Sequence, residues 1–150
     1  MKRLAIGAVF ILSLAAAACG GGGSASKALT KEEYVSKLNQ ICKDANAEEE
    51  KIGTPSGLAE FASKAPKLRA VFDSAVAKAE KLQAPSETKA DADKFIADAK
   101  RIGALLTEAV DAAKKNDEAK VIATGAKLQA VVQDGEAVGK RLGAPACAQG

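Results

Sequence analysis

Apolar residues recur at alternating intervals of three and four residues through most of the chain. The stripe is most regular in one segment, where it comprises Leu58, Phe61, Ala65, Leu68, Phe72, Ala75, Ala79 and Leu82. This spacing places side chains on one face of an α-helix and does not match the two-residue alternation of a half-buried strand. The chain is therefore predicted to be all-α.

Three further segments carry the same spacing, over residues 30–53, 86–115 and 117–142. Four amphipathic segments joined by short turns predict an antiparallel up-down-up-down four-helix bundle. The stripes are rich in alanine, which predicts a thin core with closely spaced helices. At 150 residues, the chain is long enough for one such domain with a real core.

Several residues predict where the helices begin and bend. Thr30 and Glu33 have the spacing of a capping box, in which each side chain accepts a hydrogen bond from the other residue's amide. Ser86 and Asp117 are predicted to cap the third and fourth helices. Pro66 removes one helical hydrogen bond, but the apolar stripe keeps its register across it. The second helix is therefore predicted to be one bent helix or two nearly collinear pieces.

Glycines interrupt the last predicted helix at Gly125, Gly135 and Gly139. Each costs about 1 kcal/mol of helix stability relative to alanine. Their predicted use is to let this helix approach a neighbour closely.

The start of the chain resembles a bacterial lipoprotein signal. Residues 1–3 are basic at two positions, residues 4–18 are uncharged and mostly apolar, and Cys19 follows three alanines. This is the order of a secretory signal with its cleavage site. The resemblance implies that Cys19 is acylated, with palmitate among its acyl chains, and becomes the first mature residue. Ala16 stands where a lipobox usually has leucine, so cleavage by ordinary signal peptidase and plain secretion is the alternative.

These features divide the chain into three parts. Residues 1–18 are a predicted signal peptide, residues 19–29 a lipidated cysteine with a flexible Gly/Ser linker, and residues 30–150 the helical domain. Loss of the signal reduces the net charge of +3 to about +1, which argues against a nucleic-acid partner. The predicted location is the extracytoplasmic face of the cell membrane.

Cys42 and Cys147 remain if Cys19 carries lipid. Two cysteines in an oxidising compartment predict a disulfide, and the alternative is a pair of unrelated buried thiols. To bring them together, the fourth helix must end partway along the first, with residues 144–147 lying across the face that bears Cys42. The first two turns of the first helix would then overhang the bundle.

Three structural motifs together resemble the small exported or lipid-anchored helical proteins of actinobacteria. They are a capped helix reaching a cysteine at residues 30–42, a Leu-x-x-Pro turn at 82–85, and a Leu-Gly helix end with a nearby cysteine at 142–147. The resemblance implies a helical domain pinned by a disulfide and implies no activity.

The amino-acid composition excludes most kinds of catalytic and cofactor-binding site. The chain has no histidine and no tryptophan, and its one methionine leaves with the signal. Histidine-dependent triads, the usual zinc sites and haem ligation by histidine or methionine are thereby excluded. Consecutive acids at residues 48–50 fan out around a helix and cannot converge on one ion. We expect no catalytic residue, no metal site and no cofactor, and therefore no enzyme.

The predicted function is a binding or structural module of the cell envelope that presents a helix face to an envelope protein. Val35, Val71 and Val132 lie off the main stripes and would support this function if they formed one exposed patch. The alternative is a carrier of a small apolar ligand, which requires an apolar cavity within the bundle.

Overall fold

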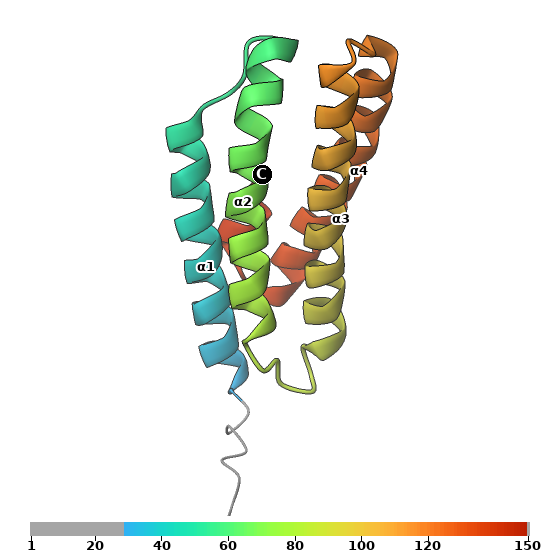
Figure 1. The fold of residues 1–150 in the computed structure, drawn as a ribbon. Helices are drawn as coiled ribbons and strands as arrows, with labels where there is room; N and C mark the ends of the chain where they lie inside the picture. Colours follow the sequence, from blue (N-terminus) through green and yellow to red (C-terminus); the bar gives the residue numbers. More distant parts are fainter. Residues whose placement is uncertain (1–28, 150) are drawn as a thin grey trace, which may run out of the picture.

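The computed structural model describes residues 29–149, and these form a four-helix bundle (Figure 1). Its elements are α1 (Lys31–Ile52), α2 (Leu58–Glu80), α3 (Lys89–Lys114), α4 (Glu118–Leu142) and a short 3-10 helix, η1 (Pro145–Ala148). Consecutive helices run antiparallel and pack in chain order, which confirms the predicted all-α up-down-up-down bundle. The predictions for the signal, Cys19 and the linker lie outside the described residues.

The beginning of α1 is capped as predicted. Thr30 Oγ1 accepts from the amide of Glu33 at 3.2 Å, and the Glu33 carboxylate accepts from the amide of Thr30 at 2.9 Å. Asp117 caps α4 by accepting from the amide of Lys120 at 3.0 Å. Both predicted caps therefore fix the first turns of their helices.

The predicted cap of α3 is wrong by two residues. Thr88, not Ser86, occupies the N-cap position, and its side chain makes no capping hydrogen bond. The reason is a separate turn after Pro85, whose carbonyl accepts from the Thr88 amide at 3.0 Å and from the Thr88 hydroxyl at 3.2 Å. The chain completes this turn before α3 begins.

The second helix continues through its proline. α2 is a single helix from Leu58 to Glu80 with Pro66 inside it. This confirms that the apolar stripe keeps one register across Pro66, since packing along that face outweighs one missing backbone hydrogen bond.

The core has two separate clusters of buried residues. The first lies where the first, third and fourth helices meet the C-terminal tail and the end of α2, and comprises Tyr34, Leu38, Ala79, Ala92, Val138, Leu142 and Ala144. The second lies between α3 and α4, with Phe72 of α2 packed against it, and comprises Ile102, Leu105, Leu106 and Val131. α1 contributes residues to the first cluster but not to the second.

The predicted overhang of α1 is wrong. Tyr34, in the first turn of α1, is 0% exposed and belongs to the first core cluster with Leu142. α4 ends close to the start of α1, because a side chain added at Gly143 would lie 3.9 Å from Val35. The tail spans the two helical turns of α1 between Val35 and Cys42. α4 therefore does not need to end further along α1 for the disulfide to form.

Candidate functional site

The predicted disulfide is present and joins α1 to the C-terminal tail. Cys42 and Cys147 have Cα atoms 5.1 Å apart and are 105 residues apart in the sequence. η1 packs against both α1 and α4, so the tail closes the bundle between its first and last helices. The predicted path of the tail across the Cys42 face is confirmed.

Two asparagines of α1 bind the backbone of the same tail residue. Asn39 Oδ1 accepts from the Ala146 amide at 2.8 Å, and Asn46 Nδ2 donates to the Ala146 carbonyl at 3.0 Å. Asn39, Cys42 and Asn46 follow one another by three and four residues and so share one helix face. Sequence reasoning missed both asparagines, although their spacing around Cys42 was a readable signal.

The three glycines of α4 have different surroundings. A Cβ at Gly139 would lie 2.9 Å from the backbone oxygen of Cys147, so this glycine permits the close approach that was predicted. The partner is η1 in the C-terminal tail and not another helix of the four-helix bundle. A Cβ at Gly125 or Gly135 would meet no atom within 4 Å, so the prediction of close approach is wrong for these two.

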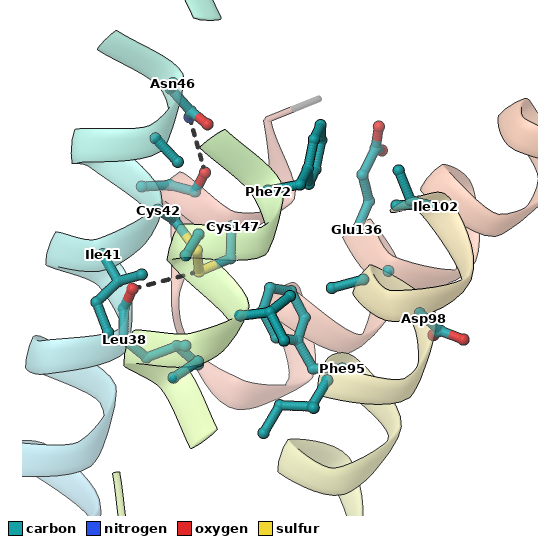
Figure 2. A pocket seen from close by; sticks show the side chains of 18 of the residues that line it. Leu38, Ile41, Cys42, Asn46, Phe72, Phe95, Asp98, Ile102, Glu136 and Cys147 are labelled. Atoms are coloured by element: carbon teal, nitrogen blue, oxygen red, sulfur yellow. Dashed lines mark hydrogen bonds between the residues drawn. A yellow bond between two sulfur atoms is a disulfide. The ribbon is translucent and has the colours of Figure 1, made fainter. Parts of the chain in front are cut away.

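A mainly apolar cavity of about 120 Å³, partly open to solvent, lies between the two core clusters (Figure 2). All four helices and the tail contribute to its wall, and the Cys42–Cys147 bond forms part of it. Its large apolar side chains are Leu38, Ile41, Phe72, Val76, Phe95, Ile96, Ile102 and Val132. Gly135 also lines it, and a side chain at that position would take up part of the free space.

The charged residues that line this cavity are all acidic. They are Glu49 of α1, Asp98 of α3 and Glu136 of α4. Asp98 pairs with Lys94 at 2.9 Å, and Glu136 lies 4.0 Å from Lys140. Glu49 makes no ion pair within residues 29–149, and its burial raises the pKa of its carboxyl.

The described surface offers little support for the predicted docking face for an envelope protein. Among large apolar residues of the described chain, only Ile122 is exposed, at 67%. Val35, Val71 and Val132 are half-buried, and Val35 and Val132 pack against different core clusters. These valines therefore do not form one exposed patch.

No family model, curated protein or solved structure matches this chain. In the part of the chain that the structure describes, no three histidine, cysteine or acidic residues gather where they could hold a metal ion. Within residues 29–149, none of the helices is both long and apolar enough to cross a membrane. A function can therefore be argued from this cavity and from the three carboxylates that line it, those of Glu49, Asp98 and Glu136.

Proposed function

We propose that this domain binds a small, mainly apolar molecule in the cavity between its two core clusters. The observation that carries the proposal is an unfilled, mainly apolar space of about 120 Å³ that is lined by all four helices and the tail. Cavities of about 150 Å³ lined by leucine, isoleucine and phenylalanine stay dry and bind benzene. The occupant would therefore be a single ring or a short branched chain.

Gly135 supports this function because it leaves the space open. Glycine inside a helix costs about 1 kcal/mol relative to alanine. A Cβ at Gly135 would meet nothing within 4 Å, so the absence of a side chain there has no steric cause. An open binding space accounts for the position better than helix packing does.

Binding, and not catalysis, fits the groups that line the cavity. The lining contains carboxylates and amides, its two cysteines are joined to each other, and the whole chain lacks histidine. A nucleophile beside a general base is the usual signature of covalent catalysis, and the lining offers no such pair. We therefore propose a non-enzymatic carrier or binding module.

The proposed place of action is the extracytoplasmic face of a membrane. The Cys42–Cys147 disulfide is typical of an oxidising compartment. The signal-like residues 1–18 agree with export, and acyl chains on Cys19 would hold the domain at the surface. The proposal thus combines a membrane anchor with a soluble binding domain.

The test uses toluene as a neutral probe and two glycine substitutions on α4. Toluene is expected to raise the melting temperature of the wild type and to shift NMR signals of Phe72, Phe95 and Ile102. Gly135→Leu fills the space and should abolish both effects. Gly125→Leu is the control, because Gly125 has the same lack of neighbours but lies on the exposed surface away from the cavity.

Two results would contradict the proposal. One is a wild type whose melting temperature and spectrum do not respond to saturating toluene. The other is a response that survives in Gly135→Leu while that variant melts cooperatively, since toluene would then bind elsewhere.

A further inference from the structure

The charged residues that line the cavity discriminate between ligands more strongly than its apolar wall does. The chain contains 22 lysines and arginines and 19 acidic residues, so its composition does not favour an acidic site. Even so, all charged side chains that line the cavity are carboxylates, contributed by three different helices. A cation would gain more from this arrangement than a neutral ligand, and an anion would be repelled by it.

Glu49 is the carboxylate whose charge is least compensated. Asp98 already has Lys94 at 2.9 Å, and its side chain is only 13% exposed. Glu136 has a distant and solvent-exposed partner, because Lys140 lies 4.0 Å away with its side chain 69% exposed. Glu49 has no ion pair with any described residue and is half-buried. A half-buried carboxylate without a cation has lost hydration without electrostatic compensation.

We infer that the preferred ligand is an organic cation, a single ammonium group on a small apolar body, whose charge lies beside Glu49 and Glu136. This inference rests on the proposed function and adds the charge of the ligand to it. The apolar body would occupy the space lined by Phe95, Ile102 and Gly135. The ammonium would donate to carboxylates that otherwise have little or no compensation.

The two phenylalanines of the wall fit a cation as well. Phe72 of α2 and Phe95 of α3 both line the cavity. In Figure 2, Phe72 lies toward the same side as Asn46 and Glu136, and Phe95 lies toward the opposite side with Leu38. An aromatic ring near an ammonium adds electrostatic attraction through its quadrupole. Two aromatic rings therefore line the space that the proposed cation would occupy.

The experiment compares three probes of nearly equal size and different charge. Benzylamine, which is protonated at neutral pH, should bind about tenfold more tightly than benzyl alcohol, since one charge-assisted hydrogen bond contributes about that much. Benzoate should bind more weakly than either. Dissociation constants can be measured by calorimetry or NMR titration at low salt, and added salt should reduce the preference for benzylamine.

Two neighbouring glutamates supply the matched variants. Glu49→Gln keeps the shape of the side chain and should reduce the preference for benzylamine over benzyl alcohol severalfold. Glu50→Gln is the control, because Glu50 is exposed and does not line the cavity. It removes the same formal charge from the protein and should leave the preference unchanged.

The outcomes distinguish a failure of the cationic-ligand inference from a failure of the proposed apolar binding function. Equal affinities for benzylamine and benzyl alcohol would overturn the cationic ligand and leave an apolar binding site intact. Equal effects of Glu49→Gln and Glu50→Gln would also overturn it, since the preference would then come from overall charge. If none of these probes nor toluene binds, the proposed function itself fails.

Discussion

Gly125 and Gly139 lie on the same helix, and replacing each by alanine should have opposite effects. Gly139→Ala is expected to destabilise the protein by about 1–3 kcal/mol, because its Cβ would meet the Cys147 backbone at 2.9 Å. Gly125→Ala should stabilise it by about 1 kcal/mol, because the new methyl group meets nothing within 4 Å. Chemical denaturation of the two variants measures both changes. Similar effects of the same sign would show that the tail does not lie against Gly139.

Two glutamates should make the stability depend on pH in opposite directions. Hydrogen bonds from Lys64 and Ser56 lower the pKa of Glu60 from 4.5 to about 2, so the stability it contributes is lost as the pH falls through that interval. Burial raises the pKa of Glu49 above 4.5, so its ionisation reduces stability as the pH rises through the folded-state pKa.

NMR titration of the two carboxyl groups checks these directions. Glu60→Gln should flatten the loss of stability below pH 4.5, whereas Glu49→Gln should raise stability at neutral pH and leave that acid limb unchanged. A Glu60 midpoint at its ordinary 4.5 would mean that its contacts with Lys64 and Ser56 do not persist in solution.

At the scale of elements, the C-terminal tail depends on its disulfide more than the helices do. Cys147→Ser should lower the free energy of unfolding by about 2–5 kcal/mol, since the bond closes a loop of 105 residues. Amide exchange at residues 144–148 should accelerate before exchange within α3 and α4 does, because only noncovalent contacts, among them those of Asn39 and Asn46, then hold the tail. Exchange that accelerates equally in all elements would contradict a locally held tail.

The helices and their caps were predictable because their signals are local. Thr30 and Asp117 sit next to the amides that they cap, and the stripe through Leu58 and Leu82 needs only helical periodicity. The disulfide followed from the number of cysteines and the assumed oxidising compartment. Ser86 failed as a cap because the turn after Pro85 competes with the helix, and short-range preferences do not decide between them.

The cavity was not predictable, because it depends on how side chains from separate helices fill the space between them. Phe72 and Phe95 looked like ordinary stripe residues, and Gly135 looked like a contact glycine. That these residues surround a space follows only from the distances between helices. The acidic lining was hidden for the same reason, since Glu49 and Glu136 are 87 residues apart in sequence and line one space only in the folded bundle.

At the scale of the whole molecule, Cys19 is the predicted attachment point. Cys19→Ala should release the domain from the membrane, because within residues 29–149 no helix could replace the acyl chains as an anchor. Cell fractionation with a high-salt wash measures the release, and mass spectrometry of the wild type should detect acyl chains on the mature protein. Cys147→Ser is the control, since it also removes a cysteine and should stay with the membrane. A Cys19→Ala protein that remains in the membrane fraction would contradict lipid anchoring.

The position of Cys147 in the wall of the cavity also determines when the cavity can be completed. Each of α2, α3 and α4 packs on the helix that precedes it in the chain, an arrangement of local contacts that favours fast folding. The wall is different, because Ala146 and Cys147 follow all four helices in the sequence and close the space against residues more than a hundred positions earlier. A chain emerging from its N-terminus can therefore assemble its helical hairpins before the wall of the cavity is complete, and the disulfide then fixes the last segment in place. Under the proposed function, newly made chains would lack the complete binding site until that segment has docked.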